Sequence, residues 1–153
     1  MTHLIEGDVA PKFKSLNQHS ESISLSDFKN KKIILFFYPK DNTPGCTAEA
    51  CDLNNNYMDL KNKGYEIIGV SPDNEKSHVK FISKYNLSFN LIADVDKELC
   101  VAYGVWGKKK FMGREYEGVN RTTFIINQDH IIEKVFTKVN TKNHSQQIIE
   151  SYK

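Results

Sequence analysis

A continuous run of β-branched and aromatic residues from Lys31 to Tyr38 constrains this chain more than any other feature. The segment from Pro39 to Gly45 follows it and is rich in residues that favour turns. A short apolar run bounded in this way is typical of a strand buried on both faces of a sheet. Apolar and small residues then recur at helical spacing from Ala48 to Lys63, and Gly64 favours a helix end. We therefore expect a central strand that leads directly into a helix.

The same alternation of strand and helix continues downstream. Short apolar runs bounded by turn residues predict strands, and apolar residues at helical spacing predict helices between them. In the second helix we expect Val79, Phe81 and Ile82 to face inward. The predicted segments are strands at 65–71 and 91–94 and helices at 75–85 and 97–103.

The end of the chain has a different pattern. Segments 122–127 and 131–137 are separated only by residues 128–130, a connection short enough to require an antiparallel hairpin. Segment 143–152 predicts a closing helix, and Phe13 to Leu25 predicts a small N-terminal hairpin. Together these patterns predict an α/β fold with a central mixed sheet of about five strands flanked by helices.

Length and charge limit the remaining possibilities. A chain of 153 residues without repeats or linkers predicts one domain over residues 1–153. Its 21 basic and 19 acidic residues leave a net charge of +2, so we expect no nucleic-acid partner, and we interpret Lys108–Lys110 as a solvated loop. The longest apolar run is too short to span a bilayer. We expect a cytoplasmic protein with no membrane partner.

The three cysteines are an odd number, which disfavours a structural disulfide framework and favours redox or buried thiols. Cys46 follows a buried strand and lies in the first turn of a helix, where unpaired amides and the helix dipole stabilise a thiolate. The segment from Pro39 to Pro44 could shape a narrow pocket around it. Thr43, the Cys46 amide and a guanidinium could then donate hydrogen bonds to both oxygens of a peroxide. Cys100 lies in an apolar segment, and we predict that it belongs to the core.

Cys51 lies five positions after Cys46. In an ideal α-helix this separation places the two Cα atoms about 8.7 Å apart. A disulfide needs Cα atoms within about 7 Å, so the two sulfurs can bond only if the helix unwinds. The spacing predicts two states, a folded one that meets the peroxide and a locally unfolded one that forms the disulfide.

Several alternatives use the same residues. A dithiol oxidoreductase would need Cys-x-x-Cys, and here four residues intervene. A Cys–His hydrolase is not excluded by residue order, but no histidine lies in a recognisable signature. His78, Cys100 and His130 lack zinc-site spacing, and the segment from Asp94 to Glu98 is better explained as a helix start than as a calcium loop. A peroxide sensor that passes its oxidation to a partner remains an alternative.

The run from Phe37 to Cys51 resembles the active-site signature of the peroxiredoxins, in particular the bacterioferritin comigratory protein or peroxiredoxin Q branch. A second match extends from Gly104 to Phe124, and the similarity covers the chain from about Leu4 to about Ile149. The resemblance implies a thioredoxin-like fold, a peroxidatic Cys46 and a resolving Cys51. It also implies that Pro39, Thr43 and Arg121 are catalytic and that the substrate contacts Thr43, Gly45 and Arg121.

The resemblance leaves Glu49 with two interpretations. This residue either holds the guanidinium of Arg121 or is an acid favoured by the helix dipole. The resemblance further implies reduction of hydrogen peroxide and organic hydroperoxides to water or alcohols, without a metal or other cofactor. Thioredoxin or a similar dithiol protein would be the reductant, and the protein would be a monomer.

Overall fold

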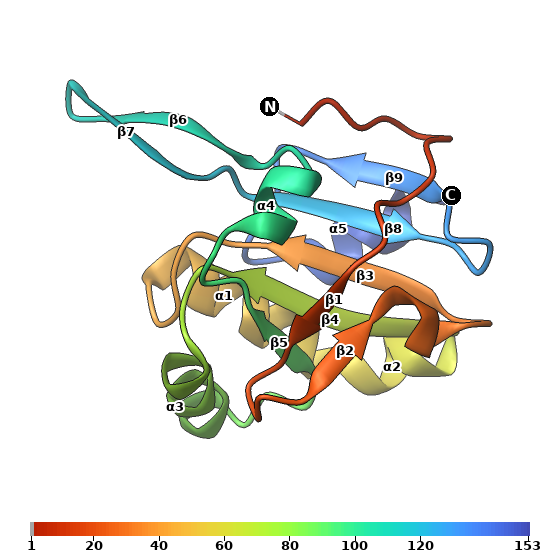
Figure 1. Cartoon of the computed structure of the whole chain (residues 1–153). Helices are drawn as coiled ribbons and strands as arrows, with labels where there is room; N and C mark the ends of the chain where they lie inside the picture. Colours follow the sequence, from red (N-terminus) through yellow and green to blue (C-terminus); the bar gives the residue numbers. More distant parts are fainter. Residues whose placement is uncertain (1) are drawn as a thin grey trace.

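The structure is a computed structural model that describes residues 2–153, and its centre is a mixed sheet of five strands (Figure 1). The strand β3 (Lys32–Phe37) lies in the middle, parallel to β4 (Tyr65–Ser71) and antiparallel to β8 (Thr122–Ile126). All six of its residues are buried or half-buried, as the apolar run predicts. In spatial order the strands are β5 (Asn90–Ala93), β4 (Tyr65–Ser71), β3 (Lys32–Phe37), β8 (Thr122–Ile126) and β9 (Ile132–Phe136).

Helices cover the two faces of the sheet unequally. Alternate side chains of β3 enter two separate apolar clusters, because successive residues of a strand point to opposite faces. One cluster contains residues of α4 (Glu98–Ala102) and of the N-terminal segment, including the 3-10 helix η1 (Leu25–Phe28). The other cluster packs against α1 (Pro44–Asn55), α2 (Tyr57–Asn62), α3 (Glu75–Tyr85) and α5 (His144–Glu150). None of the helices in residues 2–153 has the length and apolarity needed to cross a bilayer.

The N-terminal hairpin is present as β1 (Lys14–Leu16) and β2 (Ser22–Ser24), which pair antiparallel as predicted. Two helical predictions need correction. The single helix expected from Ala48 to Lys63 is wrong, because α1 begins earlier, at Pro44, and the chain leaves the helix at Asn56 before α2. Proline suits the first helical turn, where its missing N–H is not needed. At Asn56 the side chain instead bonds the Asp52 carbonyl oxygen at 2.9 Å, and the helix breaks.

Of the three residues predicted to face inward in α3, Phe81 is buried and Ile82 packs partly buried against the core, but Val79 does not face inward. Val79 is 40% exposed, whereas His78 is fully buried beside Phe81. Ranking residues by apolarity placed Val79 inside, but a histidine with both ring nitrogens hydrogen-bonded can also be buried.

The loop expected at Lys108–Lys110 is wrong as well. These residues belong to β6 (Trp106–Phe111), which pairs with β7 (Arg114–Val119) in a hairpin that projects from the body of the protein (Figure 1). The two residues at its tip, Met112 and Gly113, both have positive φ, as a two-residue hairpin turn of type I′ requires. Both faces of the hairpin are largely solvated, so no apolar alternation marks its strands.

Candidate active site

Cys46 is placed by the connection from β3 to α1. Thr43 is the N-cap of α1, and Cys46 is the third residue of the helix. Its side chain is 1% exposed and its thiol is free. Amides of a first helical turn have no partner within the helix and carry the positive end of its dipole, so this position stabilises a thiolate.

Arg121 reaches Cys46 from its position just before β8, the strand that pairs antiparallel with β3. Antiparallel pairing places Thr122 opposite Phe37, so the residue before β8 lies at the end of β3 where α1 begins. The guanidinium donates from Nη2 to Cys46 Sγ at 3.2 Å and from Nη1 to Glu49 Oε1 at 2.8 Å. Burial by itself lowers the pKa of Arg121, but the negative charges of Cys46 and Glu49 outweigh burial. The net effect is a pKa above the usual value for arginine. Arg121 is therefore a fixed cation beside the sulfur.

Glu49 accepts the hydrogen bond from Nη1 of Arg121, the nitrogen that does not face Cys46. Its side chain is fully buried one helical turn after Cys46. Burial raises the pKa of Glu49 from 4.5 to about 7, and the nearby charge of Arg121 opposes the shift. Of the two interpretations from sequence, the one in which Glu49 holds the guanidinium describes this geometry.

His144 is a member of this cluster that the sequence did not indicate. Its Nε2 lies 3.6 Å from Glu49 Oε2, a buried oxygen without a hydrogen-bond partner among the described residues. The ring also contacts Thr123 Oγ1 at 2.8 Å and Gln147 Oε1 at 2.9 Å. Burial lowers the pKa of His144, which favours the neutral ring. No local motif could have identified it, because it arrives on α5 from the far end of the chain.

The remaining predicted residues lie in the segment that leads from β3 into α1. The Thr43 hydroxyl donates to the Lys40 carbonyl oxygen at 2.8 Å, so in this state its proton is used within the turn. Its lone pairs remain available to accept a hydrogen bond, which changes the donor role expected from sequence. At Gly45 an added Cβ would lie 3.2 Å from Arg121 Nη2, so a side chain there would press on the guanidinium. Pro39 is half-buried between β3 and this turn.

The other two cysteines lie in different surroundings. Cys51 is half-buried on α1, and burial raises its pKa. Because α1 is continuous from Pro44 to Asn55, the two thiols cannot bond in this conformation. Cys100 is fully buried in the cluster on the opposite face of the sheet, as predicted, and burial followed by the charge of Asp94 raises its pKa well above the usual value.

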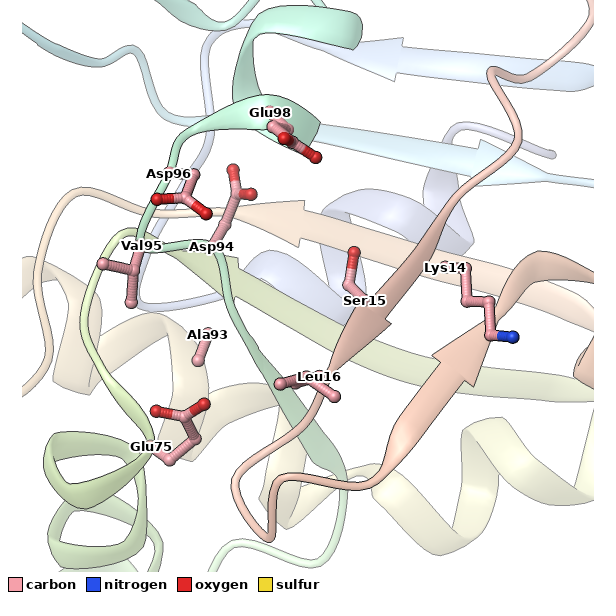
Figure 2. Close-up of a pocket in the computed structure, with 9 residues that line it drawn as sticks. All are labelled: Lys14, Ser15, Leu16, Glu75, Ala93, Asp94, Val95, Asp96 and Glu98. Atoms are coloured by element: carbon pink, nitrogen blue, oxygen red, sulfur yellow. The ribbon is translucent and has the colours of Figure 1, made fainter.

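A hollow of about 240 Å³ lies elsewhere, between β1, the end of β5 and the start of α4 (Figure 2). Four of its nine lining residues are acidic, namely Glu75, Asp94, Asp96 and Glu98, and none is a cysteine. The Asp94 carboxylate accepts hydrogen bonds from the amides of Leu99 and Cys100, at 3.1 and 2.8 Å. These contacts agree with the helix start predicted there, and the hollow lacks a group that could attack a peroxide.

Comparison with known proteins gives consistent results. Residues 6–135 match the AhpC/TSA family. The putative peroxiredoxin bcp of Haemophilus influenzae is 45% identical over 150 residues, which are 98% of this chain and 97% of that protein. Peroxiredoxin Bcp of Escherichia coli K12 is 41% identical over 149 residues, 97% of this chain and 96% of that protein.

Solved structures agree over the same length. A PrxQ variant of Xylella fastidiosa superposes with a TM-score of 0.92 at 30% identity, covering 99% of this chain and 97% of that one. The bacterioferritin comigratory protein of Xanthomonas campestris gives a TM-score of 0.86 at 28% identity, with coverage of 99% and 96%. These likenesses confirm the thioredoxin-like α/β fold and the resemblance to this branch.

Proposed function

Because the chain belongs to the AhpC/TSA family and is a thiol peroxidase of the peroxiredoxin Bcp type, we propose that Cys46 is the sulfur that attacks the peroxide. The observation that carries this assignment is the contact of Arg121 with both Cys46 and Glu49. A half-buried guanidinium that is itself held by a carboxylate is a preorganised donor, which stabilises negative charge on the sulfur and on nearby oxygens.

In the first step the Cys46 thiolate attacks one oxygen of the peroxide. The S–O bond forms as the O–O bond breaks, so the sulfur is oxidised to a sulfenic acid, and the departing oxygen takes up a proton and leaves as water or an alcohol. Arg121 and the first amides of α1 donate to the oxygens as charge develops, and Thr43 Oγ1 accepts from the peroxide hydroxyl. The substrates are hydrogen peroxide and organic hydroperoxides. In support, the Xanthomonas campestris relative reduces alkyl peroxides.

In the second step Cys51 resolves the sulfenic acid. Its thiolate attacks the Cys46 sulfur, an S–S bond forms and water leaves. This reaction requires α1 to unwind between the two residues. Partial burial, which raises the pKa of Cys51, keeps this thiol protonated and unreactive until then. Thioredoxin or a similar dithiol protein then supplies two electrons and returns both thiols.

We propose that this single domain acts as a monomer, because Cys46 and Cys51 lie on one helix and their disulfide needs no second chain. Cys46, Glu49 and Arg121 meet within one protomer, and Cys51 lies on the same helix as Cys46. Repeated reduction of the disulfide needs a reducing compartment, so we place the protein in the cytoplasm. The proposed cycle needs no metal or other cofactor.

The test is oxidation of the reduced protein with one equivalent of hydrogen peroxide, followed by peptide mass mapping. We expect an intramolecular disulfide between Cys46 and Cys51 as the main product. Cys100→Ser is the matched control and should give the same bond. A dominant bond from Cys46 to Cys100, or between two chains, would contradict the assignment.

A further inference from the structure

The turn before α1, Lys40–Thr43, is held in place by α3. Thr43 Oγ1 closes it by donating to the Lys40 carbonyl oxygen at 2.8 Å. Within it, Asn42 has a φ of 61°, and its side-chain oxygen accepts from Lys84 and Tyr85 of α3 at 3.2 and 3.1 Å. This active-site turn therefore depends on contacts outside itself for its position.

The strongest of these contacts involve Asp41, which is 7% exposed. One carboxylate oxygen accepts from the Tyr38 hydroxyl at 2.6 Å, and the other accepts from the Ser77 hydroxyl at 2.8 Å. That second oxygen also lies 2.7 Å from His78 Nδ1. The Asp41 amide donates to Asp73 Oδ2 at 2.8 Å, so both its backbone and its side chain are anchored.

Each ring nitrogen of His78 has a hydrogen-bond partner, and these partners bear on which nitrogens carry a hydrogen. Nε2 lies 2.9 Å from the Ile92 carbonyl oxygen, which can only accept, so this nitrogen must carry a hydrogen. Nδ1 faces an oxygen of Asp41, and both Asp41 oxygens already accept hydrogen bonds from hydroxyl groups, as an ionised carboxylate does. When Asp41 is ionised, Nδ1 donates as well, and the ring is then an imidazolium paired with a buried carboxylate.

We propose that His78 is a positioning residue for the peroxide step. It touches neither the sulfur nor the peroxide, and it acts by fixing Asp41 and, through it, the active-site turn that carries Thr43 and leads into α1. This role rests on the proposed function of Cys46, and it names a further residue that sets the rate of Cys46 oxidation by peroxide. A buried ion pair is weak evidence for stability but can fix one arrangement of the groups around it.

Loss of His78 would leave the Asp41 charge buried without a cation. A buried charge without a partner tends to move toward water, so the Asp41 carboxylate would shift outward. The active-site turn would be displaced with it. Displacements of about 1 Å at groups that position a substrate can lower a rate by about 100-fold, so even partial movement should be measurable.

The same cluster has the spacing of a metal site, because the donor atoms of Asp41, Asp73 and His78 lie within 4.8 Å of one another. In this structure both ring nitrogens of His78 already face acceptors, and both Asp41 oxygens accept hydrogen bonds. Hydrogen bonds therefore account for the arrangement of these three side chains without a metal ion. A chelator should leave the oxidation rate unchanged, and a metal-dependent rate would overturn the proposal.

The experiment compares His78→Leu, which removes both donors, with His78→Asn, which keeps one donor toward Asp41. Stopped-flow mixing with hydrogen peroxide measures Cys46 oxidation and, separately, disulfide formation. We expect His78→Leu to slow Cys46 oxidation about tenfold or more and His78→Asn to slow it less. His19→Leu, the same change at an exposed position, is the matched control and should react as wild type.

Asp41→Asn completes a double-mutant cycle with His78→Leu. If the two residues act as one pair, the double variant should be no slower than the slower single variant, because neither partner is then left charged and alone. Multiplied losses, or an unchanged rate in folded His78→Leu, would overturn the proposal.

Nitrogen NMR of the reduced wild-type protein needs no variant and covers the case in which His78→Leu does not fold. Both ring nitrogens of His78 should carry a hydrogen, and a bare Nδ1 would refute the proposal. Failure of the proposed function would look different. The wild-type protein itself would then consume no peroxide, or Cys46→Ser would react as fast as wild type.

Discussion

The guanidinium of Arg121 lies 3.2 Å from the sulfur of Cys46, although 75 positions separate the two residues. Pairing of β8 with β3 accounts for this proximity, because it brings the start of one strand to the end of the other. The nucleophile and its cation are therefore assembled by the sheet, and the chemistry depends on the register of two strands.

Arg121→Lys should lower the rate constant for Cys46 oxidation by about 10- to 100-fold. Lysine keeps the charge but cannot donate to Cys46 and Glu49 at once from a planar fork. Stopped-flow oxidation with hydrogen peroxide measures the change. Arg114→Lys, on the exposed hairpin, is the control and should react as wild type. An Arg121→Lys protein of undiminished rate would remove Arg121 from the mechanism.

Glu49 should make stability depend on pH. Its pKa is about 7 in the folded protein and near 4.5 when unfolded, so between these values the folded state holds more protons. The stabilising contribution is complete below pH 4.5 and is lost as the pH rises through 7. Relative to Glu49→Gln, which does not titrate, the wild type should lose on the order of 3 kcal/mol of unfolding free energy over this range.

Urea unfolding of the reduced proteins at a series of pH values measures this difference. Glu115→Gln, at an exposed position, should follow the wild-type profile. Parallel profiles for wild type and Glu49→Gln would show that Glu49 titrates equally in both states.

Hydrogen exchange should detect the unwinding of α1. Amides from Ala48 to Leu53 should exchange faster in the oxidised protein than in the reduced one, because the disulfide cannot form across an intact helix. Exchange followed by mass spectrometry measures both states, with α3 as an internal reference that should not change. Equal protection of α1 would contradict the two-state mechanism.

Cys51→Ser should separate the two chemical steps. Its first reaction with peroxide should remain fast, because Cys46 and Arg121 are untouched, whereas turnover coupled to thioredoxin should stop. The sulfenic acid would then persist and be overoxidised, which mass spectrometry detects as added oxygen. Cys100→Ser should turn over normally. Undiminished turnover in Cys51→Ser would show that another group resolves Cys46.

The sequence predicted most of the framework correctly. All five central strands and α3 have periodic or apolar patterns between breakers, and the structure matches them closely. The β6–β7 hairpin lacked such a pattern because both of its faces are solvated. The break at Asn56 went unpredicted because a side-chain hydrogen bond to Asp52 ends the helix without glycine or proline.

The sequence alone determined the order of the five central strands along the chain, the position of Cys46 at a helix start and the spacing that prevents a bond to Cys51 within that helix. These follow from local geometry, which depends only on neighbours along the chain. The tertiary structure alone decided that Glu49 is buried against Arg121, that His144 joins them and that His78 anchors the active-site turn. Such contacts join distant segments, and only the packing of strands and helices brings them together.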